Sequence, residues 1–383
     1  GSEMCIRDRS KTELDKHGNL EEYVAGIPFP PESIDPSDEQ AAVKWAWNVA
    51  YRFRGAGHQG SFRIVDFPSG LGGIQTFSGD WFVLQTRHRS DLPEQGYEVP
   101  DADGKVFASG GVFQKPFNAR HLAWRQFRPE KSQRRYQESD DLFVYIPTMR
   151  KMRRASTAWV DGLYLPRYSI SGDSGGGGIA FGNITGGGAG GSINPTAGQS
   201  IATSEHTRRG LLGITLRPNA YLWRYRGEQI VLAPINVARG GYPGSPDRNF
   251  GPSGLSVAND RWDVRYVVVI EGALRVPNEE VRTITIFVDF QTQQPLYWIS
   301  RTGRRRIIDV GILAHRYTGD MPDYPTWPTG AKTEVFEPVG AFFTNVLEGS
   351  GGWRRESYDI RSLPFSDDDR RDATNSAVLD RGR

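Results

Sequence analysis

Residues 220–234 read AYLWRYRGEQIVLAP, and this stretch decides the fold class. Its first half carries an aromatic ring at every second position, at Tyr221, Trp223 and Tyr225. A period of two residues is typical of a β-strand, in which successive side chains point to opposite faces of a sheet. Gly227 then separates this run from a second apolar run, EQIVLAP, which is the spacing of a hairpin. The stretch therefore predicts two antiparallel strands.

The same alternation continues along the second half of the chain. The further stretches are RWDVRYVVVIEG (261–272), VRTITIFVDF (281–290), PLYWISR (295–301) and RRIIDVGILAHRY (305–317). No helical period lies between them, so we expect a meander of antiparallel strands that curls to cover its own apolar face. The predicted fold class is mainly β (α+β), an open, curled antiparallel sheet or unclosed half-barrel with helices across its concave face.

One segment before the strands has a helical period. Ser37 and Gln40 have the spacing of a capping box, and they predict a helix over residues 38–53 that Gly55 ends. Its apolar residues recur at helical spacing and predict one buried face: Ala42, Trp45, Ala46, Val49 and Phe53. Short helices are also expected at GAFFTNVL (340–347) and after Ser366.

We expect a single domain over residues 22–383 and an artefactual or disordered segment over residues 1–21. The start GSEMCIRDR resembles translated sequencing-adapter sequence and contains Cys5, the one cysteine of the chain. Residues 171–200 are rich in glycine and predict a loop between strands. An export leader is expected to have been lost upstream of the adapter-like start.

The charge pattern argues against a nucleic-acid partner. Acidic and basic residues nearly balance, with a net charge of +2 over 383 residues. The local exception is LFVYIPTMRKMRRAS (142–156), in which Pro147 ends a strand, a turn follows, and MRRAS returns as a strand. Its bases are Arg150, Lys151, Arg153 and Arg154. They form either a solvated hairpin or a contact for an anionic membrane or partner.

Catalytic and metal-binding patterns are weak. The six histidines are scattered without metal-ligand spacing, so we expect no metal and no cofactor. Glu271 and Asp289, on two neighbouring strands, could form a pair of carboxylates for glycoside hydrolysis. A carbohydrate-active or other hydrolytic enzyme that uses them is the alternative to a non-catalytic binding protein.

The aromatic stripes suggest a hydrophobic pocket, although they also suit a plain core. In the first interpretation they line a cavity beneath the half-closed sheet, and the helix lies across its mouth. The candidate lining residues are Trp45, Tyr221, Trp223, Tyr225, Trp262, Tyr266 and Trp298. The pattern leaves open which face of each strand is concave.

Six segments in order resemble domain-of-unknown-function family 1329, which is outer-membrane lipoprotein-sorting-protein-like. They are GIPFPP, AWNVAYRFRG, LFVYIPTMRKMRRAS, YLWRYRGEQIVLAP, RWDVRYVVVIEGAL and SAVLDRGR. The resemblance implies the fold of the periplasmic lipoprotein carriers, in which an unclosed barrel and helices enclose an apolar cavity. It also implies location in the periplasm of Gram-negative bacteria, a lipid or other hydrophobic ligand, and an exporter of the resistance-nodulation-division type or an outer-membrane component as partner.

Overall fold

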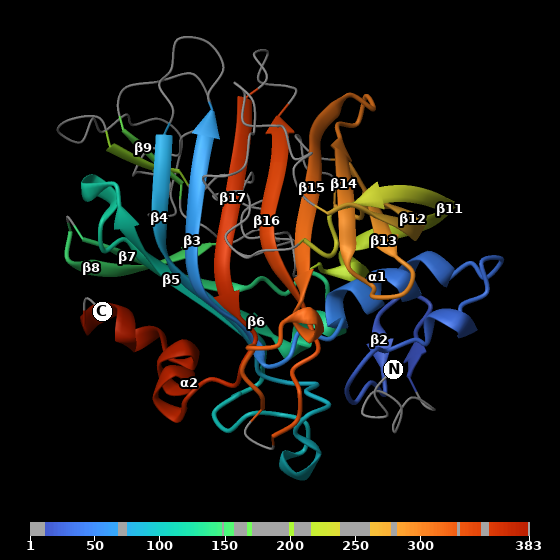
Figure 1. Cartoon of the computed structure of the whole chain (residues 1–383), viewed down its shortest axis with the longest axis horizontal. Coiled ribbons are helices and arrows are strands. Elements are labelled where there is room, and N and C mark those ends of the chain that lie inside the picture. Colours follow the sequence, from blue (N-terminus) through green and yellow to red (C-terminus); the bar gives the residue numbers. More distant parts are fainter. Residues whose placement is uncertain are drawn as a thin grey trace.

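The computed structural model describes residues 12–67, 75–147, 149–156, 167–170, 199–202, 216–237, 261–276, 282–327, 330–345 and 352–381. Within these ranges a 13-stranded antiparallel sheet dominates the molecule, accompanied by two small two-stranded sheets and two α-helices (Figure 1). None of the helices in these ranges has the length and apolar character needed to cross a membrane.

The large sheet has the strand order β11-β12-β13-β14-β15-β16-β17-β3-β4-β5-β6-β7-β8. Its first seven strands are β11 (Tyr221–Ala233), β12 (Asp263–Leu274), β13 (Thr283–Asp289), β14 (Pro295–Arg301), β15 (Ile307–Tyr317), β16 (Phe336–Asn345) and β17 (Gly352–Arg361). The other six are β3 (Gly57–Phe67), β4 (Gln75–Gln85), β5 (Lys105–Lys115), β6 (Ala123–Pro129), β7 (Asp141–Ile146) and β8 (Lys151–Ser156). Strands that follow one another in the chain pair in the sheet, except that β8 and β11 lie at its two edges and that β17 pairs with β3. The predicted meander is confirmed.

The hairpin predicted at Gly227 is wrong. β11 continues through Gly227 and pairs with β12 along its whole length. The register shifts between Tyr225 and Gly227, whose φ of 107° few side chains adopt, so an extra residue forms a bulge there. The bulge changes which residues of β11 share a face. Tyr225 lies opposite Ile270, whereas Ile230 lies opposite Tyr266, and both pairs are on the same side of the sheet.

We call the side of the sheet that carries Ile270, Trp298 and Trp81 the inner face. Strand register connects these residues, because Ile270 pairs with Ile286 and Ile286 pairs with Trp298. The buried side chains of this face form two hydrophobic clusters. One lies over β11–β13, and the other extends from β14 through β17 and β3 to β7.

Helix α1 (Ala41–Tyr51) lies against β11 and β12 and confirms the central part of the predicted helix. The predicted capping box does not form. The hydroxyl of Ser37 donates instead to the Asp35 carboxylate at 2.8 Å. Gln40 occupies the N-cap position, but its side chain donates to the Asp15 carbonyl at 3.1 Å and does not cap the helix. The helix therefore begins three residues later than expected.

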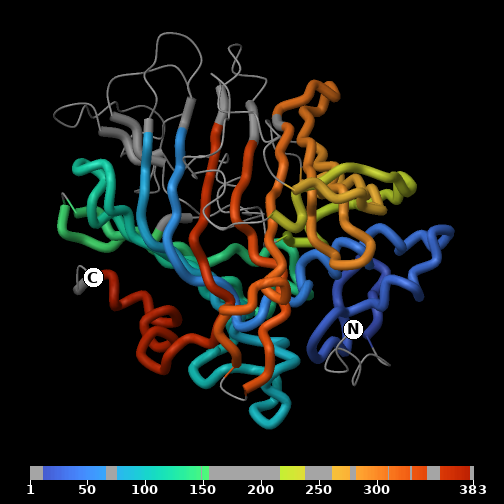
Figure 2. The backbone as a smooth tube through the Cα atoms, viewed as in Figure 1, coloured from blue at the N-terminus to red at the C-terminus, as the bar shows by residue number. Residues whose placement is uncertain are grey.

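Nine of the eleven residues of α1 are buried, so the helix is covered on all sides and not on one face alone. A small hairpin of β1 (Glu13–Leu14) and β2 (Leu20–Glu21) supplies part of the cover (Figure 2). The indole of Trp47 donates to the Gly18 carbonyl at 3.0 Å, and Leu20 is buried in the cluster around α1. Residues 12–21 thus pack on the domain, although the sequence pattern places its start at residue 22.

Helix α1 shows that the sheet is curled. It packs on β11 and β12, at one end of the strand order. At its C-terminus, the hydroxyl of Tyr51 accepts a hydrogen bond from Gln133, just after β6 and near the opposite end of the order. A single helix can contact both ends only if the sheet bends around it. The predicted open, curled sheet with a helix across its concave face is confirmed, and the inner face is the concave one.

The outer face carries the C-terminal helix α2 (Asp367–Thr374), beside β4 and β5. The helix expected after Ser366 is confirmed, since Ser366 accepts a bond from the Asp369 amide at 3.1 Å. The helix expected at residues 340–347 is wrong, because its described residues belong to β16, paired on both sides. The glycine-rich residues 171–198 lie outside the described ranges. Strands β9 (Arg167–Ile170) and β10 (Gln199–Ala202) pair on either side of them.

A buried carboxylate joins the two ends of the curled sheet. Asp140, just before β7, accepts bonds from Arg128 of β6 at 3.0 Å and from Arg217, four residues before β11, at 2.5 Å. Burial acts to raise the pKa of Asp140, but the two guanidinium groups and their hydrogen bonds outweigh burial and lower it. The ion pairs stay formed at neutral pH and fix the segment before β11 against β6.

We expect Asp140→Asn to destabilise the fold strongly. The substitution leaves two buried guanidinium groups without their counter-charge, which costs about 3–5 kcal/mol in the free energy of unfolding. Urea denaturation followed by tryptophan fluorescence measures the loss. Asp103→Asn is the control, because the Asp103 carboxylate is 86% exposed in its ion pair with Lys105. Equal stability of the two variants would contradict the bridging role of Asp140.

Candidate ligand-binding site

The aromatic stripe of β11 lies on the inner face, next to helix α1. Tyr221 is buried, while Trp223 and Tyr225 are half-buried at the border of the same hydrophobic cluster as Trp45. The Trp223 indole donates to the Pro218 carbonyl at 2.7 Å, which fixes the ring. These four predicted lining residues therefore come together on one surface.

Beyond the Gly227 bulge this surface becomes exposed. Its apolar side chains form two cross-strand pairs, Ile230 with Tyr266 and Leu232 with Val264. Ile230 is 73% exposed and Val264 is 68% exposed. We call these four residues the inner-face patch. Clustered exposed apolar side chains are typical of binding surfaces, because water contact with them is unfavourable.

The inner-face patch is continuous with the buried aromatic cluster. Tyr266 lies 5.6 Å from the Phe290 ring, and Phe290 lies 5.4 Å from the ring of Trp45. At the polar rim, Tyr225 donates to a carboxylate oxygen of Glu228 at 2.6 Å, and Tyr266 donates to its other oxygen. These two bonds lower the pKa of Glu228, which keeps the rim charged. Of the patch residues, the sequence pattern had singled out Tyr266 alone.

Two predicted lining residues lie elsewhere. Trp298 is buried in the other inner-face cluster, where its indole covers Gly311 so closely that a Cβ there would come within 2.1 Å of the ring. Trp298 is therefore a packing residue of the sheet. Trp262 is half-buried at the residue before β12, close to the patch in sequence.

Glu271 and Asp289 do not form a paired-carboxylate site. Asp289 lies opposite Val267 in the sheet, four residues from Glu271 along β12, which corresponds to about 13 Å. Carboxylates that act together in glycoside hydrolysis are about 5–9.5 Å apart. Each carboxylate also has its own arginine, Arg265 for Asp289 at 2.7 and 3.0 Å and Arg226 for Glu271. The carboxylates therefore stabilise the sheet as separate ion pairs.

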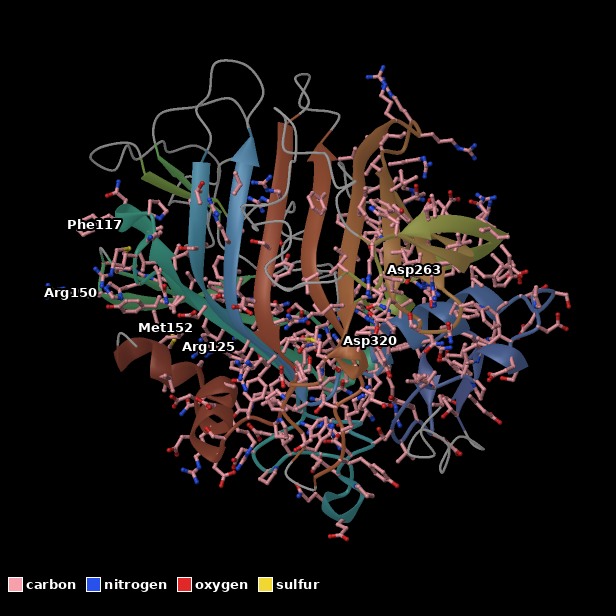
Figure 3. All side chains as sticks on the ribbon, in the orientation of Figure 1. Phe117, Arg125, Arg150, Met152, Asp263 and Asp320 are labelled. Carbon is pink, nitrogen blue, oxygen red and sulfur yellow. The ribbon has the colours of Figure 1, made fainter. Side chains whose placement is uncertain are left out.

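The basic hairpin forms as expected, with β7 ending at Ile146 and β8 beginning at Lys151. β8 is an edge strand of the sheet. Its bases do not share one face: Arg153 lies opposite Val144 on the inner face, whereas Arg154 is ion-paired with Asp141. Figure 3 shows Arg150 at this edge, far across the molecule from Asp263 at the start of β12.

A group of buried basic side chains lies behind the C-terminus of α1. Burial lowers the pKa of His88 to about 4 and, with a smaller effect of Arg52, that of His315 to about 3. Burial and then the charges of Arg54 and Arg52 also hold the pKa of His58 well below its usual value. These histidines are neutral at pH 7. No group of three or more His, Cys, Asp or Glu side chains in the described part of the chain has metal-ligand geometry.

The cavity beside α1 is too small for a lipid chain. Its volume is about 30 Å³, between the end of α1, β5, β6 and residues 216–219. A single water molecule needs about 10–15 Å³ of such a cavity, so this one has room for two or three non-hydrogen atoms. This cavity therefore does not hold the tail of a hydrophobic ligand.

Comparison with known proteins gives one family. Residues 3–167 match the model of DUF1329, described as "Protein of unknown function". The resemblance drawn from the sequence is thereby confirmed over this part of the chain. A search of curated proteins gives no match.

Solved structures similar to this chain have low sequence identity, 12% in each of the following cases. An outer membrane lipoprotein-sorting protein domain from Vibrio parahaemolyticus covers 90% of this chain and 100% of its own, with a TM-score of 0.47. A DUF1329 family protein from Desulfovibrio piger covers 90% and 99%, with a TM-score of 0.48. A LolA superfamily protein from Nitrosomonas europaea covers 86% and 95%, with a TM-score of 0.38.

We expect the buried histidines to make the fold sensitive to acid. Their folded-state pKa values lie below the ordinary value of about 6.5, so the unfolded chain binds protons that the native state does not. Their stabilising effect is complete above about pH 6.5 and is lost as the pH falls. Between pH 7 and pH 5 each histidine should lower the free energy of unfolding by about 2 kcal/mol.

Urea denaturation at several pH values measures this loss. His315→Gln should reduce the slope of stability against pH between pH 6.5 and 4.5, because one buried histidine no longer titrates. His121→Gln, at an exposed position, is the control substitution. A free energy of unfolding that stays constant from pH 7 to pH 5 would show that the buried histidines do not control acid stability.

Proposed function

We propose that this protein is a non-catalytic binding or carrier protein for a lipid or other hydrophobic ligand, and that the ligand lies on the inner-face patch. The observation that carries the proposal is the exposure of four paired apolar side chains on the concave face, continuous with the cluster around Trp45. The family resemblance supports location in the periplasm. The separate arginine partners of Glu271 and Asp289 argue against the hydrolytic alternative.

The size of the patch indicates what it can hold. Covering one fully exposed aliphatic or aromatic side chain contributes about 1.5–3 kcal/mol, so four partly exposed ones contribute roughly 4–8 kcal/mol. A buried methylene group of a lipid chain contributes about 0.8 kcal/mol, so this matches roughly 5–10 methylene groups. Binding of this strength corresponds to dissociation constants of about micromolar to millimolar, which allows release to a partner.

We propose further that the partner is an exporter of the resistance-nodulation-division type or an outer-membrane component, contacted by the basic hairpin. The support is the family resemblance and the position of β8 at the edge of the sheet. Because this edge lies across the molecule from the patch, a bound ligand and a bound partner would not compete for the same surface (Figure 3).

Replacing two patch residues should weaken ligand binding. We expect the double variant Ile230→Ser/Val264→Ser to bind the fluorescent probe N-phenyl-1-naphthylamine at least about tenfold more weakly, because about 1.5–3 kcal/mol of apolar contact is lost. Phe117→Ser is the control, since Phe117 is 84% exposed but lies at the opposite edge of the molecule. Native mass spectrometry of protein purified without detergent should show a co-purified ligand in the wild type. Unchanged probe affinity in the double variant would refute the patch as the site.

Removing the bases of the hairpin should weaken attachment to an anionic surface. With Arg150, Lys151, Arg153 and Arg154 replaced by Gln, we expect association with anionic vesicles or the partner to fall by several kcal/mol at low salt, about 1 kcal/mol for each base near the surface. High salt should remove the difference, because screening acts over about 10 Å at ~0.1 M. The control replaces the exposed bases of residues 304–306, in the turn between β14 and β15. If the hairpin variant binds vesicles and partner as well as the wild type does, the hairpin is a solvated turn. If the wild type binds oligonucleotides and the variant does not, the hairpin is a nucleic-acid site.

A further inference from the structure

The turn between β5 and β6 carries an aromatic ring that water surrounds. Phe117 is 84% exposed, the highest exposed fraction of any large apolar side chain in the described part of the chain. Two residues further on, Ala119 is 1% exposed and packs in the same inner-face cluster as Leu122. A single exposed apolar side chain is common on protein surfaces, so its meaning depends on how the ring is held and on what surrounds it.

The backbone that carries Phe117 is firmly held. The Arg120 amide donates to the Phe117 carbonyl at 3.1 Å, and the His121 amide donates to a carbonyl at the end of β5 at 2.9 Å. The buried side chains of Ala119 and Leu122 fix the same segment on the protein side. The exposure of the ring is therefore a property of the folded turn.

The β5–β6 turn and the basic hairpin leave the sheet at the same end. In register, Val112 of β5 lies opposite Ala123 of β6, Ala123 lies opposite Tyr145 of β7, and Tyr145 lies opposite Met152 of β8. Both turns follow within a few residues of this row. Figure 3 accordingly shows Phe117 and Arg150 at the same edge of the molecule.

The charges around Phe117 at this edge are mainly positive. Four bases of the two turns are exposed, and none of them has an ion-pair partner in the described part of the chain: Lys115, Arg120, Arg150 and Lys151. One carboxylate, that of Asp80, lies opposite Val112 below the β5–β6 turn, where it accepts a hydrogen bond from Gln114. The edge thus combines a projecting apolar ring with bases that lack acidic partners among the described residues.

We propose that this edge docks on an anionic lipid membrane, with the Phe117 ring inserted among the lipids and the bases of the two turns against the headgroup phosphates. A bilayer surface presents anionic groups above an apolar layer, and a projecting ring flanked by bases complements that order. The inference rests in part on the proposed function, because it takes the basic hairpin as an attachment site. It deepens that role by naming a lipid surface and an inserting side chain.

Flotation with vesicles of phosphatidylethanolamine and phosphatidylglycerol measures the contribution of the ring. We expect Phe117→Ser to bind at least about tenfold more weakly than the wild type, since one aromatic side chain loses its apolar contact. Phe117→Trp should keep the affinity. Leu222→Ser is the matched control, because Leu222 is 55% exposed but lies on β11, at the other edge of the strand order.

The bases of the β5–β6 turn are tested on the same vesicles at low salt. Lys115→Gln/Arg120→Gln should weaken binding by about fivefold for each base near the surface, and high salt should remove the loss. Arg304→Gln/Arg305→Gln removes the same charge from exposed positions in the turn between β14 and β15 and should bind like the wild type. An equal loss in both double variants would show attraction by overall charge and overturn the inference.

A dye placed beside the ring measures insertion directly. In the Cys5→Ser background, Asn118→Cys is labelled with the environment-sensitive dye NBD, whose fluorescence should rise when vesicles are added and should not rise once Phe117→Ser is introduced. The same label at Asp320→Cys, exposed and away from this edge, should not respond (Figure 3). An unresponsive dye at residue 118 in the presence of bound vesicles would exclude insertion.

The results separate this inference from the proposed function. A wild type that binds no vesicles, or a Phe117→Ser variant that binds them as well as the wild type or the Leu222→Ser control does, would overturn the inference. The affinity for N-phenyl-1-naphthylamine should be unchanged in Phe117→Ser. If Ile230→Ser/Val264→Ser keeps its probe affinity while Phe117→Ser loses vesicle binding, the proposed ligand site is wrong and the membrane contact is supported.

Discussion

The ion pairs of Asp140 are the constraint on which the rest of the structure depends. In the described part of the chain the open sheet of 13 strands ends at β11 and β8, and strand pairing alone does not determine how far such a sheet curls. Asp140 connects β6 with the segment that enters β11, near the two ends of the strand order. Because these groups are buried, the geometry between them is tightly defined. The curvature then leaves a space that α1 fills, and that is why the helix is buried on nearly every side.

The same constraint places cationic groups in the interior. Arg52 and Arg54 follow the C-terminus of α1, where their bonds to the last carbonyls satisfy the end of the helix. The curled sheet closes over them and removes them from water. Burial is the main cause that holds the pKa of His58 below its usual value, and the charges of Arg54 and Arg52 lower it further. The acid sensitivity that we expect therefore depends in part on how the helix ends.

Local sequence patterns predicted much of the fold, and long-range packing decided the rest. The alternation of apolar and polar residues around Trp223 and around Ile286 identified both strands correctly. This alternation can be recognised from residues adjacent in the chain, without knowledge of long-range packing. The role of Gly227 was misjudged, since a glycine between two apolar runs suits a hairpin as well as a bulge, and only pairing with β12 distinguishes them. The patch residue Ile230 was missed for this reason. The sequence around Arg54 does not distinguish it from a surface arginine. Its burial depends on β5, β6 and residue 219, which are far away in the chain.

Two features of this structure oppose stability. The inner-face patch exposes apolar area that water disfavours. Arg54 buries two donors that have no acceptor within the described part of the chain. Such local inconsistencies are expected at functional sites, where a ligand supplies what the protein alone does not.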